Sequence, residues 1–242
     1  RVRVLDVIDS PGRPDGCEFV QASVLDRETV RGAVEGVDFV HHTAALVPLT
    51  KAGAHFREVN VEGTRIVAEA ALAAGVSMFL HTSSSAVFGA PRCPITEKTP
   101  LRPIETYGRS KVDAEVCLRE VRARGLACAI IRPRTVLGPG RLGIFQILFE
   151  WMREGRALYV IGDGRNLLQF LHVSDLVAVS LLCISRDRPG TYNVGAARFG
   201  SLRDDLKSVI RHAGSKSRIV GLPVNATVAT LKALDRLRLS PL

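Results

Sequence analysis

The sequence predicts an α/β fold, in which a parallel β-sheet is flanked by helices and a smaller α/β lobe follows towards the C-terminus. Up to residue 132, short strand-like apolar segments alternate with helix-like segments at the spacing of βαβ units. Polar residues follow the ends of several of these strands, where parallel sheets bind their ligands. After Pro133 the alternation becomes less regular, which indicates a second, smaller unit.

Length and composition limit the class of protein. The chain has 242 residues, of which 46% are hydrophobic, enough for one sizeable domain with a smaller lobe. The longest apolar runs, such as 176–184, are too short to cross a bilayer, and we expect a soluble, cytoplasmic protein with no membrane partner. The five cysteines form no CxxC pair and have no histidine at metal spacing, so we expect no metal site and a reducing compartment.

The positive charge of the chain is a weak indicator of its partners. The formal net charge is +9, but the basic residues alternate with acidic ones and only 5% of residues are aromatic. This composition disfavours a surface that binds nucleic acid. Attraction of phosphate-bearing small molecules and a merely solvated surface both remain open.

The first three predicted strands cover residues 2–6, 18–21 and 37–42. The first strand ends in an acid, Asp6, and the third runs into the small residues 43–45. Between the second and third strands, Asp26 is expected to cap the N-terminus of a short helix that ends near Gly36.

The central part of the chain continues this alternation. A long helix is predicted over residues 55–74 and a fourth strand over 78–83. A proline-rich loop, 84–103, precedes a helix that begins near Tyr107 and ends at Gly125. The fifth strand is predicted over residues 127–132.

The C-terminal part contains a Gly/Pro loop, a helix over 144–154 and a short strand near Tyr159. Ser174 is expected to cap an apolar helix that ends at Ile184, followed by a strand-like segment, 191–194, and amphipathic pieces. The predicted domains are 1–137 with 168–195, a nucleotide-binding domain, and 138–167 with 196–242, a substrate-binding lobe.

Tyr107 and Lys111 are the candidate chemical pair. Residues four apart share one face of a helix, so the ammonium can lie beside the phenol. Bringing a tyrosine pKa from about 10 to about 7 takes roughly 4 kcal/mol of preferential stabilisation of the phenolate, and a neighbouring cation supplies part of it. An ordinary amphipathic helix is the alternative. We expect this helix to start at the same edge of the sheet as the polar strand ends, and this favours an active site there.

The chain resembles the extended short-chain dehydrogenase/reductase family, which includes NAD-dependent epimerases and dehydratases and the 3-beta-hydroxysteroid dehydrogenase-like enzymes. The resemblance covers nearly the whole chain and implies a Rossmann-like doubly wound parallel sheet and a homodimer. Its landmarks, in order, are Asp6, His42-Thr-Ala-Ala45, Asn60-Val-Glu-Gly-Thr64, Thr82-Ser-Ser-Ser-Ala-Val-Phe-Gly89, Tyr107-Gly-Arg-Ser-Lys111, Arg132-Pro133, Gly138-Pro-Gly140, Phe170-Leu-His-Val-Ser-Asp175 and Tyr192-Asn-Val-Gly195.

The resemblance implies an oxidoreductase or isomerase that moves a hydride to or from NAD at a secondary hydroxyl or ketone. Tyr107 would be the general acid/base, Lys111 would lower the tyrosine pKa and bind the nicotinamide ribose, and Ser84 would hold the reacting oxygen. If the alignment with the family motif is shifted by one residue, Ser83 or Ser85 takes this role instead. The residues implied in cofactor binding are Asp6, Ser23, Val24, Ala44, Ala45, Asn60, Thr82, Tyr107, Lys111 and Pro133.

Some of these residues have simpler alternatives. Asp6 would accept hydrogen bonds from the adenosine ribose and repel a 2′-phosphate, which favours NAD over NADP, but a strand-end turn also suits it. Asn60 would face the site or lie on the helix surface. His42 and His172 are better explained as hydrogen-bonded core residues than as catalysts.

The chain departs from the family at the cofactor side. The first strand and the Gly-rich turn that binds the pyrophosphate are expected before Val2 and are absent from the sequence. A further segment of roughly 25–30 residues is expected there. The alternative is a non-catalytic regulatory protein of the same fold. The GxGxxG match at 138–143 is a poor substitute, because Pro139 lacks an N–H to donate to phosphate.

The substrate side also departs from the pattern. Sugar-nucleotide enzymes of the family usually have Asn at the position of Thr135 and Arg-Asp in place of Leu168 and Gln169. Arg165 or Arg134 could replace the lost diphosphate contacts. A nucleotide sugar and a less polar hydroxysteroid- or flavonoid-like alcohol therefore both remain open as small-molecule substrates.

Overall fold

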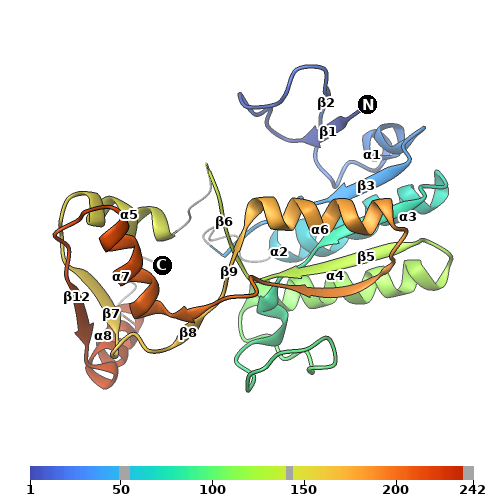
Figure 1. Ribbon diagram of the computed structural model, residues 1–242. Coiled ribbons are helices and arrows are strands. Elements are labelled where there is room, and N and C mark those ends of the chain that lie inside the picture. Colours follow the sequence, from blue (N-terminus) through green and yellow to red (C-terminus); the bar gives the residue numbers. More distant parts are fainter. Residues whose placement is uncertain (49–54, 140–143, 237–242) are drawn as a thin grey trace. The chain divides into compact units, whose positions relative to one another are not determined.

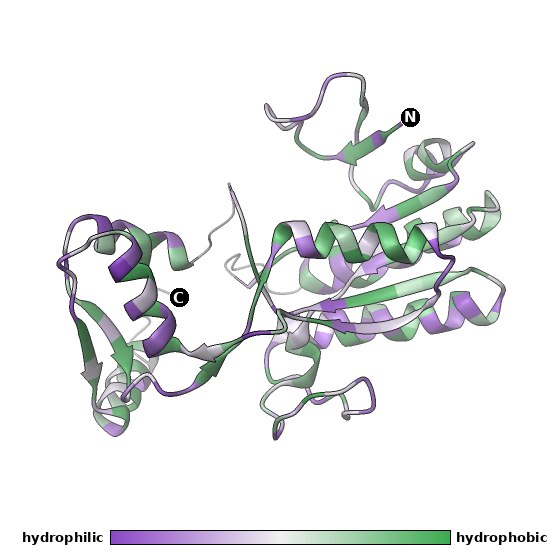
Figure 2. Ribbon diagram, in the orientation of Figure 1, coloured by the Kyte–Doolittle hydropathy of each residue, from purple (hydrophilic) through white to green (hydrophobic). Residues whose placement is uncertain are grey.

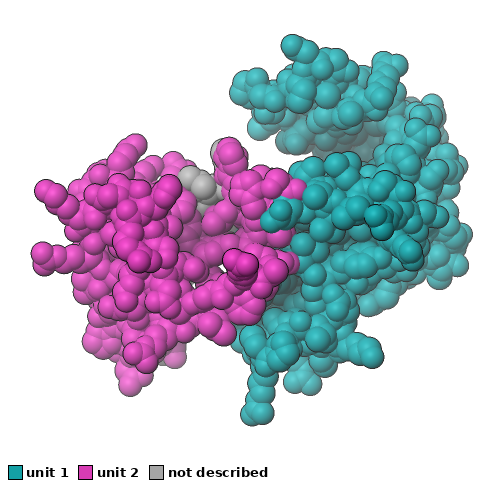
Figure 3. Space-filling model, in the orientation of Figure 1, with its two compact units in different colours: residues 1–134, 175–194 teal, residues 135–174, 195–242 magenta. Residues whose placement is uncertain are grey.

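The computed structural model describes residues 1–48, 55–139 and 144–236 of the chain. These residues divide into two compact units, coloured differently in Figure 3: unit 1 contains 1–134 and 175–194, and unit 2 contains the remainder. The units differ from the predicted domains at 135–137, 168–174 and 195, which lie in unit 2. The predicted assignment of the domains to cofactor and substrate stays a prediction.

The core of unit 1 is a four-stranded sheet in the order β10-β5-β4-β3, and every neighbouring pair in it is parallel. The strands are β3 (Phe39–His42), β4 (Met78–Thr82), β5 (Cys128–Pro133) and β10 (Gly190–Val194). β5 is buried along its whole length and β4 is buried except at its last residue, because helices cover both faces of the sheet. This confirms the predicted parallel sheet.

Different helices cover the two faces of this sheet (Figure 1). One core cluster joins α1 (Arg27–Val34), α3 (Thr64–Ala73) and α4 (Thr106–Ala123) to Phe79 and Ile130. On the other face, α6 (Val173–Ser185) contributes Cys183 and its neighbours to a cluster with Met78, Leu80, Ala129 and Ile131. Figure 2 shows how strongly hydrophobic α6 and the central strands are.

The N-terminal strands form a separate two-stranded parallel sheet of β1 (Arg3–Asp6) and β2 (Glu18–Gln21). The Arg3 guanidinium holds this sheet to α1 by donating to the Ala33 carbonyl oxygen at 2.7 Å. A hollow of about 650 Å³, lined by residues of both β1 and β3, lies between the two sheets of unit 1. The strands predicted for this unit are therefore present. In the described residues they belong to two separate sheets.

The helix predicted over 55–74 is interrupted. It consists of α2 (His55–Arg57), a π-helical turn η1 (Glu58–Gly63) and α3. By contrast, Asp26 caps α1 as predicted, accepting from the Thr29 N–H at 3.1 Å, and Gly125 follows α4 with a φ of 112°. The strand before the proline-rich loop leads into a short 3₁₀ helix, η2 (Ser85–Phe88), which the sequence did not predict.

Unit 2 packs its helices against short strands around Met152, Leu158, Val160 and Leu206. Its strand pairs are β6 with β9, β8 with β11 and β7 with β12. Ser174 lies inside α6 rather than capping it, because the helix begins at Val173. The elements are β6 (Thr135–Leu137), α5 (Ile144–Arg153), β7 (Leu158–Ile161), β8 (Leu167–Leu168), β9 (Phe170–His172), β11 (Gly200–Ser201), α7 (Leu202–His212), β12 (Ile219–Leu222) and α8 (Val224–Arg236).

No helix in the described residues is both long and apolar enough to span a membrane. All five cysteines are unpaired, and Cys117, Cys128 and Cys183 are buried. Within the same described residues, no group of three or more metal-ligating side chains comes together.

Candidate active site

Lys111 lies buried where helix α4 crosses the carboxyl end of β4. Only 3% of its surface is exposed, and its ammonium donates a hydrogen bond to the Thr82 carbonyl oxygen at 2.9 Å. Burial lowers the pKa of Lys111 to about 8, while the Glu115 carboxylate, one helical turn further on, opposes that change. A lysine in such a place still carries its charge near neutral pH.

The Tyr107 ring lies on the same helix as Lys111, as the spacing predicts. The Lys111 ammonium nitrogen is 6.0 Å from the centroid of the Tyr107 ring. The ring of Phe56, from α2, meets the tyrosine ring edge-on at a centroid distance of 6.3 Å. The half-buried phenol thus stands between an aromatic neighbour and a cation.

Gly108 brings the start of α4 close to the serine-rich segment after β4. A Cβ atom at Gly108 would lie only 2.6 Å from the Ala86 carbonyl oxygen, so the two backbones touch where a larger residue would separate them. Ser84 caps η2 directly before this contact, and its hydroxyl accepts from the Ala86 N–H at 3.1 Å. The contact places the elements that carry Ser84 and Tyr107 side by side.

Ser83 is bound inside the protein. Its hydroxyl donates to Glu115 Oε1 at 2.6 Å, and the same carboxylate accepts from Arg132 Nε at 2.9 Å. All three residues are at most 5% exposed. This network ties α4 to the ends of β4 and β5 and leaves Ser83 less available than Ser84 for a ligand.

Asn60 points inward from the π-helical turn. It is 1% exposed, and its amide bonds both the N–H and the carbonyl oxygen of Leu46 and the hydroxyl of Ser110. The alternative of a helix-surface asparagine is therefore wrong.

Three histidines lie beside the site on β3 and β4. His42 is buried and bonds the Thr64 hydroxyl at 3.0 Å, which confirms it as a hydrogen-bonded core residue, and burial lowers its pKa to about 3. His81 stacks on His42 at a centroid distance of 5.6 Å, and both of its ring nitrogens lack a hydrogen-bond partner among the described residues. His41 bonds the Thr82 hydroxyl. His172 is exposed instead, and the prediction that it is a core residue is wrong.

The residues predicted on the cofactor side have different surroundings. Asp6 is exposed at the end of β1, and its carboxylate accepts from the Ile8 N–H at 3.3 Å, an arrangement that also suits a turn. The Ser23 hydroxyl accepts from Leu25, whereas the Val24 side chain is buried against Gly63. The remaining predicted residues end strands of the four-stranded sheet: Ala44 and Ala45 follow β3, and Pro133 closes β5.

Most of the residues that bear on the substrate class lie in unit 2, whereas Arg134 belongs to unit 1. Gln169 donates to the Ala196 carbonyl oxygen at 2.8 Å and packs against Gly195, so its amide is already engaged. Thr135 is exposed at the start of β6. Arg165 is exposed and pairs with Asp163. Leu168 and Gln169 themselves supply neither a guanidinium nor a carboxylate at these two positions.

Comparison with known proteins identifies the family of this chain. Residues 2–195 match the model of the NAD dependent epimerase/dehydratase family. The chain belongs to this family. The landmarks found in the sequence, and the parallel sheet that carries them, agree with that membership.

Three relatives show the breadth of the epimerase/dehydratase family. An uncharacterized protein, y4nG, of Sinorhizobium fredii is 44% identical over all of this chain and 61% of its own length. A 3beta-hydroxysteroid-dehydrogenase/decarboxylase of Arabidopsis thaliana is 31% identical over 74% of this chain and 33% of its own length. A structure of MoeE5 in complex with UDP-glucuronic acid and NAD is 25% identical, with a TM-score of 0.79, over 92% of this chain and 78% of that one. The chain thus spans less than two thirds of the length of the first two relatives.

One family feature has no counterpart in the described residues. In unit 1 of the described chain, no glycine-rich turn leads from a strand into a helix. Of the GxGxxG match at 138–143, residues 140–143 lie outside the described residues, and a Cβ at Gly138 would collide with Val173. No described residue is therefore assigned to the pyrophosphate of a dinucleotide.

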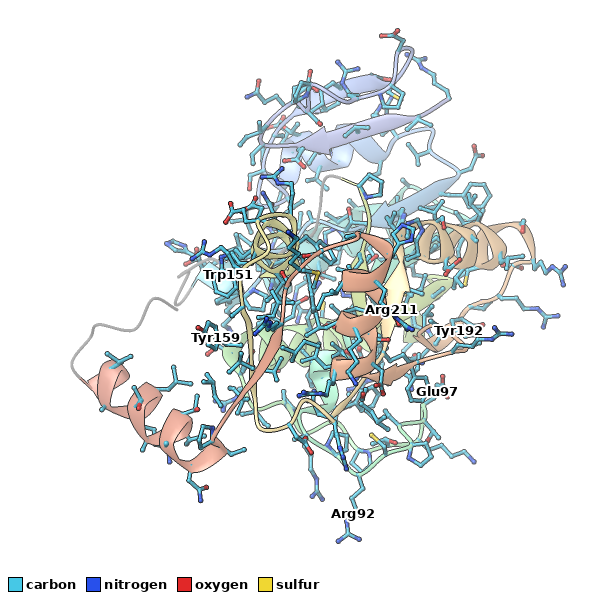
Figure 4. All side chains as sticks on the ribbon, turned by 60° about the vertical axis from the view of Figure 1, so that its left-hand side comes forward. Arg92, Glu97, Trp151, Tyr159, Tyr192 and Arg211 are labelled. Atoms are coloured by element: carbon cyan, nitrogen blue, oxygen red, sulfur yellow. The ribbon has the colours of Figure 1, made fainter. Side chains whose placement is uncertain are left out.

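Sequence reasoning missed several residues that shape this site. Ser110 and the π turn were not predicted, because the hydrophobic pattern of a helix does not show where its hydrogen bonding changes locally from α to π. Glu97 was also missed: it holds the proline-rich loop to β10 by accepting from the Asn193 N–H at 2.9 Å, and this bond lowers the pKa of Glu97. Figure 4 labels Glu97 and also Tyr192, the neighbour of Asn193 in β10. Glu97 is an isolated acid in a polar loop, and nothing in the neighbouring sequence predicts Asn193 as its partner.

Proposed function

We propose that the protein is an NAD-dependent oxidoreductase or epimerase that acts at a secondary hydroxyl or ketone. In this proposal Tyr107 moves the proton of the reacting oxygen, Lys111 favours the phenolate, and Ser84 binds the oxygen. The observation that carries it is the buried Lys111 ammonium, 6.0 Å from the Tyr107 ring on the same helix. Burying a lysine is costly, and a catalytic use explains why it is tolerated here.

The residues present suit the ribose parts of the cofactor. Thr82 is the only hydrogen-bond partner of the Lys111 ammonium among the described residues, which leaves two N–H donors for a ribose hydroxyl. The exposed Asp6 carboxylate can accept from the other ribose. NAD bound by these residues would accept or return the hydride.

The proton chemistry follows from this arrangement. Removing hydride from a carbon requires that the proton on its hydroxyl be taken, and a phenolate within hydrogen-bond reach can take it. The ammonium of Lys111 stabilises the phenolate by charge. The Ser84 hydroxyl keeps its own hydrogen available while it accepts from Ala86, and that hydrogen can hold the substrate oxygen.

The substrate class stays open between two alternatives. The relatives include a hydroxysteroid dehydrogenase/decarboxylase and a protein bound to UDP-glucuronic acid. The engagement of Gln169 with Ala196 removes one polar group from substrate binding and supports the less polar alcohol. The exposed Arg165 supports the nucleotide sugar, because a short movement would free it from Asp163.

The proposal is tested with NAD and a panel of both substrate classes, following nicotinamide absorbance. We expect Tyr107→Phe to reduce turnover by at least about 100-fold, since general acid–base groups contribute about 10²–10⁴. Tyr159→Phe, a change at an exposed tyrosine of unit 2, is the matched control and should keep full turnover. Equal turnover of Tyr107→Phe and wild type contradicts the mechanism. Any substrate-dependent absorbance change excludes the non-catalytic regulator.

A further inference from the structure

The π-helical turn η1 gives Asn60 an unusual position. A π turn inserts one extra residue into a helix, so the helix before it and the helix after it present different faces. Here the turn directs Asn60 at helix α4, and the Thr64 hydroxyl donates to the Asn60 carbonyl oxygen at 2.7 Å. π turns are rare and occur frequently at functional sites.

The Asn60 amide has little capacity left for a ligand. Its oxygen accepts from the Leu46 N–H at 2.8 Å, and its nitrogen donates to the Leu46 carbonyl oxygen at 3.1 Å and to the Ser110 hydroxyl at 3.0 Å. Both N–H donors are therefore used inside the protein. With a side chain that is almost fully buried, Asn60 reaches no external molecule.

Ser110 connects the Asn60 side chain to the first turn of α4. Its buried hydroxyl accepts from Asn60 and donates to the Tyr107 carbonyl oxygen at 2.7 Å. The chain of bonds thus runs from Leu46, in the segment after β3, through two side chains to the backbone of Tyr107. The first turn of α4 cannot shift without breaking one of these bonds.

The position of that turn controls the pairing of phenol and ammonium. The Lys111 ammonium is held by Thr82 at the end of β4, and not only by its own helix. Its distance to the Tyr107 ring therefore depends on where the first turn of α4 lies relative to β4. We propose that Asn60 and Ser110 are positioning residues that fix Tyr107 relative to Lys111, and that Asn60 does not bind the cofactor. The inference rests on the proposed function of Tyr107.

The test uses the absorbance of the tyrosinate ion. The chain has three tyrosines, so Tyr159→Phe combined with Tyr192→Phe leaves Tyr107 as the only one. In this background of the 242-residue chain, absorbance at about 295 nm is titrated against pH for Asn60→Ala, Ser110→Ala and the double variant. Ser180→Ala is the matched control, because Ser180 is a buried helix serine whose hydroxyl donates to the Leu176 carbonyl oxygen in α6.

We expect Asn60→Ala and Ser110→Ala to raise the pH midpoint of the tyrosine titration by similar amounts, about 0.5 to 1 pH unit, as the phenolate loses its alignment with the ammonium. The double variant should shift no further than the larger single variant. Ser110→Thr, which keeps the hydroxyl, should restore the midpoint, and Ser180→Ala should leave it unchanged. If Asn60→Ala does not fold, Asn60→Asp replaces it, since it keeps the shape and loses both N–H donors.

Two results would overturn the inference. One is a lower melting temperature with an unchanged titration midpoint, which would mean that the bonds only stabilise the fold. The other is a shift in Asn60→Ala without one in Ser110→Ala, which would mean that Asn60 acts by another route. The titration needs neither substrate nor nucleotide, so its failure is distinguishable from full turnover of Tyr107→Phe, which would overturn the proposed function instead.

Discussion

Glu115 and Arg132 form an ion pair inside unit 1, with side chains that are 1% and 6% exposed. Two nitrogens of the guanidinium donate to the two carboxylate oxygens, and Ser83 donates to one of them. Glu115 lies one helical turn beyond Lys111, and its pairing with Arg132 joins α4 to the central strand β5. Neither charge can reach water if the other is removed.

We therefore expect Glu115→Gln to lower the free energy of unfolding by about 3–5 kcal/mol, because it leaves the Arg132 charge buried without a counter-ion. Urea unfolding followed by circular dichroism measures this. The control is Glu120→Gln, which breaks an exposed pair with Arg65 and should cost less than about 1 kcal/mol. Similar losses in the two variants would show that the buried pair contributes no more than a surface pair.

Lys111→Met should change how stability depends on pH. Because burial lowers the pKa of Lys111 to about 8 from 10.5, the folded chain binds fewer protons than the unfolded chain between those values. Wild-type stability from this group therefore rises as pH increases from 8 to 10.5, by up to about 3 kcal/mol. Urea unfolding at pH 7 and at pH 10.5 should show the variant losing stability relative to wild type at the higher pH. A constant difference would contradict the lowered pKa.

The fold of unit 1 could be predicted because its strongest signals are local. The cap at Asp26 and the i, i+4 pair of Tyr107 and Lys111 depend on neighbours in the sequence, and the structure contains both. Buried strands such as β5 are recognisable as short apolar runs.

The remaining features depend on partners far apart in the chain. Asn60 finds Ser110 fifty residues away, and Glu97 finds Asn193 across 96 residues. A hydrophobic pattern carries no information about such polar pairs. The small strands of unit 2, such as β8 and β11 with two residues each, are too short to show a period of two.

His81 should limit stability in acid. Burial, followed by the Lys111 charge, lowers its pKa well below the ordinary value, so the folded state keeps it neutral. Its contribution to stability is complete above pH 6.5 and falls as the pH decreases, by up to about 1.4 kcal/mol per pH unit.

We expect His81→Leu to remove this dependence, and also to raise stability at pH 7 by about 1 kcal/mol or more, because the two ring nitrogens have no partner among the described residues. Melting temperatures between pH 7 and pH 4 measure both effects. His55→Leu, at an exposed position, serves as the control and should retain the wild-type slope. A variant as acid-sensitive as wild type would contradict the role of His81 and leave the loss to other groups with a lowered pKa, such as His41 and His42.

Gly108 should be the glycine at which a single methyl group harms both stability and turnover. An added Cβ would lie 2.6 Å from the Ala86 carbonyl oxygen and 3.1 Å from Pro103 Cβ, so the start of α4 must move away from the segment that carries Ser84. We expect Gly108→Ala to cost about 1–2 kcal/mol, the clash exceeding the better helix propensity of alanine. Turnover should fall by about 100-fold, because a displacement of about 1 Å has that effect on reacting groups.

Gly32→Ala in α1 is the matched control, since nothing lies within 4 Å of its added Cβ. Alanine there should raise stability by about 1 kcal/mol and leave turnover unchanged. Unfolding by urea and the nicotinamide assay, applied to both variants, separate the two effects. If Gly108→Ala unfolds at a lower urea concentration but keeps its turnover, the approach of α4 to Ala86 stabilises the fold without setting the distance between Ser84 and Tyr107.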